Sequence, residues 1–299
     1  FSFLLCYNEK TMHKSGGEKV GNMTRLQGLA LLFATAVLWS TSGIGIKWVD
    51  WHPLAIAGAR SGIAAIVVWA AFRKNSLHWN RSLFIGGVAY ALTVLLFVSA
   101  TKLTTAANAI LLQYTYPVFV AVLGMLFLQE KPCKADWLTM GTVCVGMVLF
   151  FQEQMSPGRL EGNMLAIASG VAMAVMVVAL RSQKEGTPWG SVLLGNVLAA
   201  LGGLPFFFDG GPGGEGWLAL LAMGVVQLGL SYVLYSVAIK KVTALEASIV
   251  TMVEPLLNPL WVFLLLGEQP GIWSLWGGSV ILTAMTVRYV LPELRQRIG

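Results

Sequence analysis

Apolar stretches long enough to cross a lipid bilayer follow one another along almost the whole chain. From Leu26 onward, short polar breaks separate ten such stretches, at approximately residues 26–47, 54–72, 82–101, 106–128, 137–151, 161–180, 191–208, 217–239, 245–266 and 272–291. About 20 apolar residues in a helix cross the hydrocarbon core of a membrane. Because backbone groups in lipid must be paired within the chain, and these stretches are too long for barrel strands, we expect helices. The sequence therefore predicts an all-α integral membrane protein with ten transmembrane helices.

Composition excludes most soluble alternatives. Only 11% of the 299 residues are charged, whereas about a quarter are charged in an ordinary soluble domain. Too few charged side chains are present to cover a water-exposed surface, so a soluble enzyme is not expected. The three cysteines show no CxxC spacing and the three histidines are isolated, which gives no metal-ligand cluster. We expect no metal, no cofactor and no enzymatic activity.

The basic residues indicate how the chain is oriented. If the N-terminus is cytoplasmic, sixteen of the 20 Lys and Arg residues fall on the cytoplasmic side, three on the other side and Arg60 inside a span. This bias is what the positive-inside rule expects of a protein in the cell membrane with both termini cytoplasmic. The same rule explains the net charge of +6, and no basic stretch interleaved with aromatic residues indicates nucleic-acid binding.

The chain contains an internal repeat. Arg25-Leu26-Gln27-Gly28 recurs as Arg159-Leu160-Glu161-Gly162, and at an offset of 138 residues several Lys, Thr, Pro and Glu positions also match. Each copy holds five predicted crossings, an odd number, so the second copy enters the membrane from the opposite side. Inverted repeats are typical of secondary transporters. We therefore predict two inverted five-helix repeats at residues 25–155 and 156–291, between an N-terminal tail or extension at 1–24 and a cytoplasmic tail at 292–299.

The repeated motifs resemble those of the EamA family of the drug/metabolite transporter superfamily. The resemblance covers roughly residues 25 to 291 and lies in Trp39, Arg60, Pro117, Gln129-Glu130-Lys131-Pro132, Glu254-Pro255 and Gly267-Glu268-Gln269-Pro270. It implies ten helices in two inverted repeats and movement of small metabolites such as amino acids across a membrane. It does not identify the substrate. A homodimer is compatible with it.

Polar residues recur on one side of two predicted helices. In the ninth segment, Glu246, Glu254 and Asn258 lie at i, i+8 and i+12, which places the successive pairs about 80° and 40° apart around a helix. In the fourth segment, Asn108 and Tyr116 occupy the positions that match Glu246 and Glu254. We expect both faces to line one central cavity.

Two charged residues are the candidates for coupling transport to protons. Burial disfavours the charged form of a carboxylate such as Glu254, so this residue is suited to carry a proton or to bind an amine; a capping or packing role beside Pro255 is the alternative. Glu246 shares its helix face. Arg60 is an anchor for a substrate carboxylate or a partner for Glu254, or its long side chain reaches the membrane interface.

Other polar groups within the spans are candidates for substrate contact. Trp39 lies at mid-span beside Ser40, Thr41 and Ser42, which indicates a locally polar stretch. Tyr90 and Gln227, like Gln113 and Tyr232, place a polar group inside a predicted helix, although core packing is the usual role of such aromatic residues. The candidate cavity residues are thus Trp39, Ser42, Tyr90, Asn108, Tyr116, Gln227 and Asn258.

The function most consistent with these features is secondary active transport of a small metabolite, an amino acid or related compound, as an exporter working by alternating access. Its expected partners are a small-molecule substrate, protons and the lipid bilayer. A membrane channel or a non-transporting membrane assembly subunit is the alternative. No phosphate-binding loop of the Walker type is present, which disfavours direct use of ATP.

Overall fold

Helices are the regular structure throughout the described part of the chain. The computed structural model describes residues 23–41, 45–46, 48–152, 160–184, 186–208, 210–257 and 271–291, which contain no strand. The α-helices are α1 (Arg25–Trp39), α3 (Pro53–Phe72), α4 (Arg81–Leu103), α5 (Ala106–Gln113), α6 (Tyr116–Leu123), α7 (Lys134–Phe151), α8 (Leu160–Ser182), α9 (Pro188–Gly203), α10 (Gly213–Ala222), α11 (Ser231–Ala238), α12 (Ala244–Thr251) and α14 (Ile272–Met285). The π-helical stretches are η2 (Gly124–Leu128), η4 (Met223–Leu230) and η5 (Thr286–Val290), and η3 (Leu204–Phe206) is a 3₁₀-helix.

Polar side chains in the breaks fix where helices begin. Thr24 Oγ1 accepts a hydrogen bond from the Gln27 backbone N–H at 3.3 Å, and Asn80 Oδ1 accepts one from the Leu83 N–H at 2.8 Å. Each bond satisfies a backbone donor that has no partner inside the helix. The short polar breaks in the sequence therefore do more than separate apolar segments, because their side chains also cap the helices that follow.

Seven helical stretches are long and apolar enough to cross a membrane. They are Pro53–Phe72, Arg81–Leu103, Asn108–Leu128, Lys134–Phe151, Leu160–Ser182, Pro188–Phe206 and Gly213–Ala238. They correspond to the second through eighth predicted segments, which supports a multi-pass membrane protein. The first segment is described as a shorter helix of 15 residues, and the ninth lies partly outside the described residues. The ten-helix, two-repeat arrangement therefore stays a prediction.

The outer surface of these helices is apolar. Large side chains such as Leu126, Phe127 and Leu218 are each about 70% exposed. Large apolar side chains exposed to this extent on many helices are unusual for a soluble monomer. Lipid is the solvent that makes this surface favourable, because a helix pairs its interior backbone groups internally and leaves only apolar side chains to face the hydrocarbon.

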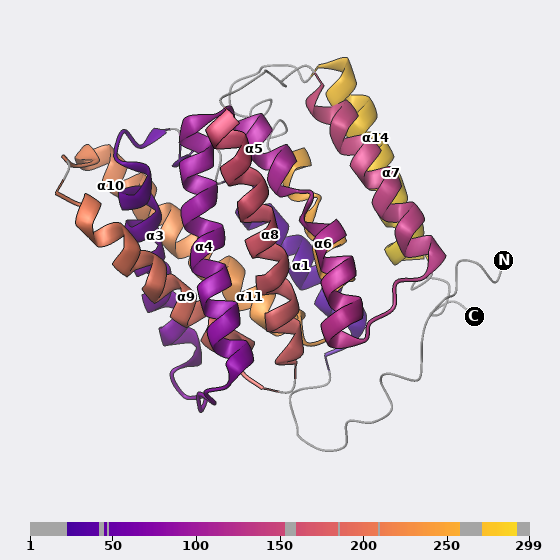
Figure 1. Cartoon of the computed structure of the whole chain (residues 1–299), viewed down its shortest axis with the longest axis horizontal. Helices are drawn as coiled ribbons and strands as arrows, with labels where there is room; N and C mark the ends of the chain where they lie inside the picture. The colour runs from indigo at the N-terminus through magenta and orange to yellow at the C-terminus, as the bar shows by residue number, and fades with distance from the viewer. Residues whose placement is uncertain are drawn as a thin grey trace.

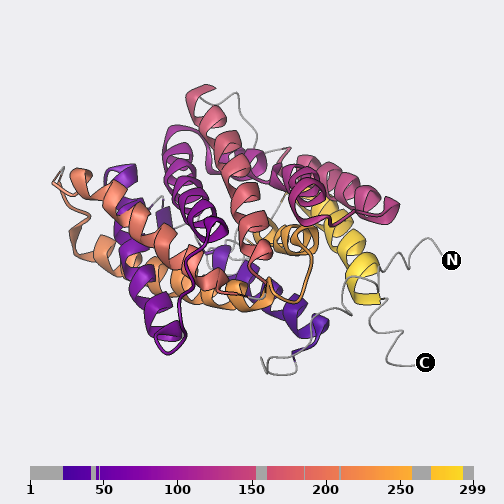
Figure 2. The ribbon, with the colours of Figure 1, turned by 60° about the horizontal axis from the view of Figure 1, so that its bottom comes forward.

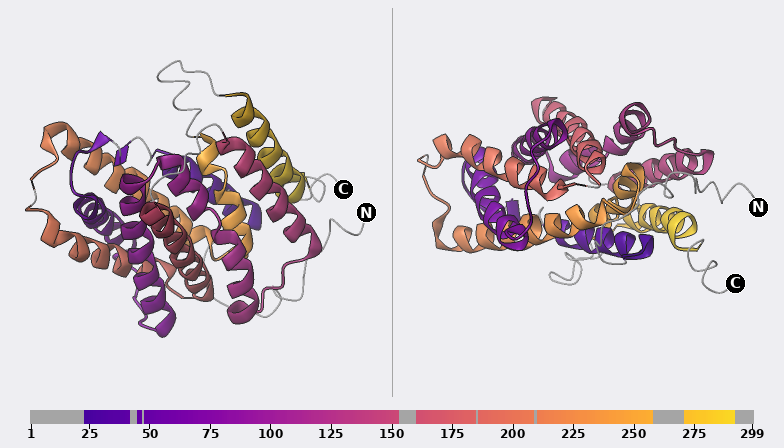
Figure 3. Two further views of the ribbon diagram at one scale, coloured as in Figure 1. Left: turned by 45° about the horizontal axis from the view of Figure 1, so that its top comes forward. Right: turned by 90° about the horizontal axis from the view of Figure 1, so that it is seen from below.

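The helices form one main group with a helix pair at its edge. In the main group, α4 packs against α8 and α9, while α3 packs against α9 and η4. Helices α7 and α14 lie side by side at one edge of this group (Figure 1), and they keep this place in the other views (Figures 2 and 3). These two helices end the two predicted repeats.

Glycines allow α7 and α14 to approach closely. A Cβ atom on Gly277 would lie 2.5 Å from the carbonyl oxygen of Gly146 and 2.4 Å from the backbone nitrogen of Phe150. Close backbone approach through small residues is a common way for membrane helices to associate. The Ser274 hydroxyl adds a hydrogen bond to the Phe150 carbonyl oxygen at 3.0 Å. Close backbone packing and this hydrogen bond thus both join the pair.

Candidate functional site

A cavity lies among helices from both halves of the chain. Its volume is about 50 Å³, which is smaller than that of most small-molecule sites. Helices α1, α3, α4, α5, α8 and α11, with η4 and the helical turn 254–257, supply its lining. The lining residues are Trp39, Arg60, Thr93, Val94, Phe97, Gln113, Met173, Gln227, Leu228, Tyr232 and Glu254.

The cavity sits well inside the protein. Trp39 ends α1, 14 residues after Arg25 begins it, so the two lie roughly 20 Å apart along the helix axis. Arg60 lies seven residues after Pro53 begins α3, roughly 10 Å from that helix end. These two lining residues therefore lie well away from the helix starts at Arg25 and Pro53.

Arg60 is buried in this cavity and forms no ion pair with an acidic residue among those that the structure describes. Arg60 is 2% exposed. Its Nη1 donates to Gln227 Oε1 at 3.2 Å, and its Nε has no hydrogen-bond partner among the described residues. Gln227 belongs to η4, a π-helical stretch of eight residues, and such stretches occur frequently at functional sites. Burying a charge without a counter-charge is expensive, so inside a membrane a residue of this kind indicates function.

Glu254 contributes a carboxylate to the same cavity. The Tyr114 hydroxyl donates a short hydrogen bond to Glu254 Oε2. No ion pair joins Glu254 to Arg60 within the described part of the chain, where the ion pairs involve other residues. A guanidinium group and a carboxyl group therefore line one cavity and form no ion pair with each other.

Aromatic rings form one wall between these charges. Trp39 stacks on Tyr235 with 5.5 Å between ring centroids and packs at a tilt on Tyr232 at 5.0 Å. Trp39 Nε1 donates to Ser231 Oγ at 2.9 Å, which satisfies its only donor. The packing and the hydrogen bond together fix the orientation of this indole ring at the cavity.

Two broken helices place Glu254 and Tyr114 together. One helix is interrupted at residues 114–115, between α5 and α6, and the other at residues 252–253, after α12. A proline follows each break, Pro117 and Pro255, and proline cannot donate the backbone bond that a continuous helix needs. Residues late in the first segment contact residues early in the second, because the Ala244 N–H donates to Glu130 Oε2 at 2.9 Å. Residues early in the first segment contact residues late in the second, because the Tyr114 hydroxyl donates to Glu254. The two segments are therefore antiparallel.

The predicted site residues fall into three groups. Trp39, Arg60, Gln227 and Glu254 line the cavity. Tyr90 and Tyr116 are fully buried behind the lining, where the Tyr90 hydroxyl bonds Asn196 Oδ1 at 3.1 Å and the Tyr116 hydroxyl bonds the Ser248 carbonyl at 2.9 Å. The remaining four candidates, considered next, are Asn108, Glu246, Ser42 and Asn258.

Asn108 and Glu246 lie at helix starts rather than on the cavity lining. Each occupies the third position of its helix, after the capping residues Thr105 and Thr243. Glu246 completes a capping box by accepting from the Thr243 N–H at 2.8 Å, and it forms an ion pair with Arg25 at 2.6 Å. Ser42 and Asn258 lie outside the described residues.

Sequence reasoning missed Tyr114 and Thr93. Tyr114 is 4% exposed and sits in the break before Pro117, so the proline was the available signal for a polar contact nearby. Thr93 bonds its own helix through the Ala89 carbonyl at 2.8 Å, and nothing in the sequence distinguishes it from other threonines of the spans. Gln113 and Tyr232 were recognised as polar groups within the membrane, but the sequence alone did not place them at the cavity.

A second hollow, between α7 and α14, has a different character. Its lining is mostly apolar, and the charged residue among the described lining is Arg288, which is paired with Asp136 at 2.7 Å. The surface of α7 around it also exposes apolar side chains such as Leu138 and Val145. This hollow is suited to lipid contact, so the central cavity is the candidate functional site.

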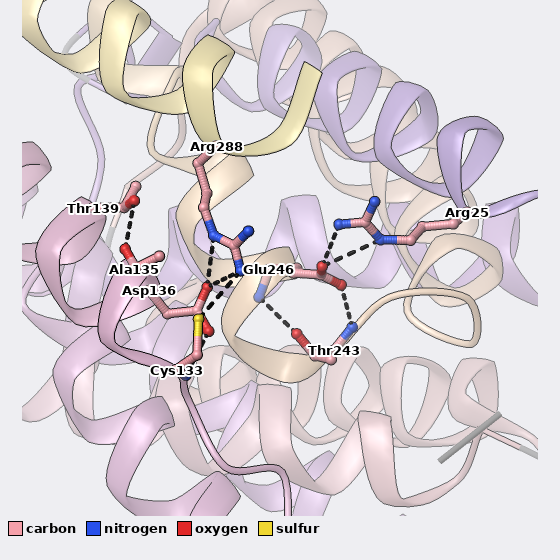
Figure 4. Close-up of polar contacts among 8 residues, drawn as sticks. All are labelled: Arg25, Cys133, Ala135, Asp136, Thr139, Thr243, Glu246 and Arg288. Carbon is pink, nitrogen blue, oxygen red and sulfur yellow. Dashed lines mark hydrogen bonds and ion pairs between the residues drawn. The ribbon is translucent and has the colours of Figure 1, made fainter. Parts of the chain in front are cut away.

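Three ion pairs between described residues join the two halves of the chain. Arg25 pairs with Glu246 at 2.6 Å, Arg288 with Asp136 at 2.7 Å and Arg181 with Glu130 at 2.7 Å. In each pair one residue precedes and the other follows position 156, and the side chains are only 12–19% exposed. Figure 4 shows the first two pairs next to each other at the starts of α7 and α12.

These pairs gather at one end of the helices. Glu130 also accepts from the first backbone N–H of α12, and Arg181 Nη1 donates to the carbonyls of Ile239 and Lys240 at 3.1 Å. The loops at this end carry further basic residues such as Lys134 and Lys241. Ion pairs and caps therefore bind the two halves together on the side of the protein that is rich in Lys and Arg.

Comparison with known proteins agrees with this picture. A model of the EamA-like transporter family matches residues 26–152 and again residues 160–289. A solved crystal structure superposes with a TM-score of 0.78 at 20% sequence identity, and the match covers 90% of this chain and 99% of that one. That likeness shows the fold.

Curated relatives are similar along most of their length. An uncharacterized transporter of Archaeoglobus fulgidus is 27% identical over 264 residues, which cover 88% of this chain and 96% of the relative. The threonine/homoserine exporter RhtA of Salmonella typhimurium is 27% identical, with 81% and 84% covered. Solute carrier family 35 member G1 of Homo sapiens is 24% identical, with 87% and 78% covered.

Proposed function

The chain belongs to the EamA-like transporter family, and from this premise we propose that it is a secondary active transporter that exports an amino acid or a closely related zwitterion by alternating access. One observation carries the proposal: Arg60 and Glu254 line a single buried cavity and form no ion pair with each other. A zwitterion supplies the two missing partners, because its carboxylate complements Arg60 and its ammonium group complements Glu254.

The cavity offers a chemically distinct place for each end of such a substrate. The Nε of the Arg60 guanidinium has no hydrogen-bond partner in the described part of the chain, and guanidinium groups bind carboxylates through two parallel hydrogen bonds. Glu254 accepts an ammonium group, and the faces of Trp39 and Tyr232 nearby attract cations. Most of the remaining lining is apolar, so the side chain of the substrate is not required to be charged.

Proton coupling follows from competition at Glu254. A carboxylate binds either a proton or the substrate ammonium group, so loading one releases the other. When the zwitterion is bound, Glu254 stays ionised and the site keeps its negative charge. When a proton is bound instead, the negative charge of Glu254 is neutralised. Exchange of one proton moving inward for one zwitterion moving outward therefore carries one positive charge inward, and both the pH gradient and the membrane potential favour export.

The ion pairs fit the alternating-access part of the proposal. They join the two halves on the basic side, which the positive-inside rule assigns to the cytoplasm. Access from that side requires the pairs Arg25–Glu246, Arg181–Glu130 and Arg288–Asp136 to separate as the halves rock. The antiparallel broken helices support the inverted-repeat arrangement on which such rocking depends.

Purified protein in liposomes tests the proposal. Because one relative is a threonine/homoserine exporter, labelled L-threonine and L-homoserine are the first probes, followed by other amino acids. Vesicles with an acidic lumen are expected to accumulate the substrate, with saturable uptake that unlabelled substrate inhibits. Flux that does not saturate indicates a channel, and absence of flux for every amino acid indicates a non-transporting subunit.

A further inference from the structure

The helix break beside Glu254 leaves one backbone carbonyl without its helical donor. In a continuous helix, the carbonyl of Thr251 accepts from the N–H four residues later. That residue is Pro255, which has no N–H. The Tyr114 hydroxyl lies 3.3 Å from the Thr251 carbonyl oxygen and takes the place of the missing donor.

The same hydroxyl is also the hydrogen-bond partner of Glu254. A tyrosine hydroxyl carries one hydrogen, so it serves either the Glu254 carboxylate or the Thr251 carbonyl at a given moment. An ionised carboxylate is the stronger acceptor. A protonated Glu254 becomes a donor to the tyrosine oxygen and releases the tyrosine hydrogen to Thr251.

From this geometry we propose that Tyr114 is a positioning residue that relays the protonation state of Glu254 to the helix break at residues 252–253. With Glu254 ionised, Tyr114 donates to the carboxylate and the Thr251 carbonyl loses its donor. With Glu254 protonated, Tyr114 donates to the carbonyl and the break is satisfied. The relay rests on the proposed function, because it gives proton-loaded and substrate-loaded transporter different backbone hydrogen bonding at the break.

Other groups around Glu254 do not have this position. Tyr116 lies at the same break, but its hydroxyl bonds the Ser248 carbonyl at 2.9 Å and Thr251 Oγ1 at 2.6 Å. Tyr232 and Arg60 line the cavity with Glu254. Of these titratable and charged neighbours, Tyr114 is the one that bonds both the carboxylate and the orphaned carbonyl in the described structure.

Infrared difference spectroscopy of the full-length protein in lipid tests the relay without a transported substrate. The C=O stretch of the protonated Glu254 carboxyl group is followed through a pH titration and identified by its loss in Glu254→Gln. In Tyr114→Phe the ionised carboxylate loses its donor, so the titration midpoint is expected to rise by about 1–2 pH units. Tyr116→Phe is the matched control and is expected to keep the wild-type midpoint.

A second variant moves the midpoint in the opposite direction. Pro255→Ala restores an N–H for the Thr251 carbonyl, so this carbonyl keeps a donor when Glu254 is ionised. Ionisation of Glu254 then costs less, and the titration midpoint is expected to fall by about 0.5–1 pH unit. Equal midpoints in wild type, Tyr114→Phe and Pro255→Ala overturn the relay, as does an upward shift in Pro255→Ala. This titration is independent of the liposome assay, in which loss of gradient-driven flux would count against the proposed function.

Discussion

Replacing Arg60 by Gln is expected to weaken binding of zwitterionic substrates while sparing amines. The guanidinium is buried, donates to Gln227 at 3.2 Å and has an Nε that no described residue accepts from. Loss of its charged hydrogen bonds to a substrate carboxylate removes about 3 kcal/mol, or on the order of 100-fold in Kd. Titration calorimetry with purified protein and L-threonine, or another amino acid identified by the liposome screen, measures this difference directly.

The amino alcohol that corresponds to the substrate is the control ligand, because it keeps the ammonium group and lacks the carboxylate. Its affinity is expected to change little in Arg60→Gln. Arg60→Lys keeps the charge but loses the planar two-point geometry, so it is expected to bind the amino acid with intermediate affinity. Equal losses for the amino acid and the amino alcohol would show that Arg60 supports the structure of the cavity instead of binding the carboxylate.

Three further predictions concern packing, the basic side and topology. Gly277→Ala is expected to lower thermal stability by about 1–3 kcal/mol because its Cβ would meet the backbone of α7 at 2.4 Å, whereas Gly278→Ala, with 3.8 Å to its nearest neighbour, is the tolerated control in the same melting experiment. Burial raises the pKa of the Cys133 thiol above its usual 9.0. Because the thiolate is the reactive form, maleimide labelling of Cys133 is expected to be slow at pH 7 and to accelerate with each unit of rising pH beyond pH 9. Fast labelling at pH 7 would contradict this expectation. Single cysteines at Asn75 and Gly211 are expected to label from the cytoplasmic and the opposite side respectively. The reverse result would contradict the predicted orientation, and labelling of both from one side would contradict the inverted topology.

The membrane class and the family could be predicted because apolar spans and sequence motifs do not depend on how the helices pack. Spans of apolar residues are set by bilayer thickness, and seven predicted segments coincide with helices of sufficient length in the structure. The family resemblance rested on paired motifs around Pro117 and Glu254, and the family match is confirmed over both halves of the chain.

The residues that line the cavity were harder to predict from the sequence, because helix periodicity does not continue across a break. The angles that placed Glu246 and Asn108 on the faces of Glu254 and Tyr116 assume continuous helices. The structure inserts turns at residues 252–253 and 114–115, so the rotation of 100° per residue does not carry through them. Eight residues also separate the members of each pair by roughly 12 Å along a helix axis, which leaves Glu246 at the helix start with Arg25.

The contact between Tyr114 and Glu254 was not predictable from spacing at all. The two residues are 140 positions apart and meet because two breaks from different halves pack side by side in antiparallel directions. The prolines mark where each helix is interrupted. They did not indicate which side chain from the other half would satisfy the carbonyl that Pro255 leaves without a donor.

The most direct test of the account is gradient-driven uptake by Glu254→Gln in liposomes. Glutamine keeps the shape of the side chain and accepts hydrogen bonds but does not titrate. An acidic lumen is expected to drive accumulation of labelled amino acid by the wild-type protein and not by the variant, which should retain exchange of internal for external substrate with weaker, pH-independent affinity. Accumulation by Glu254→Gln that follows the pH gradient as in the wild type would contradict the proposal that this carboxylate carries the proton.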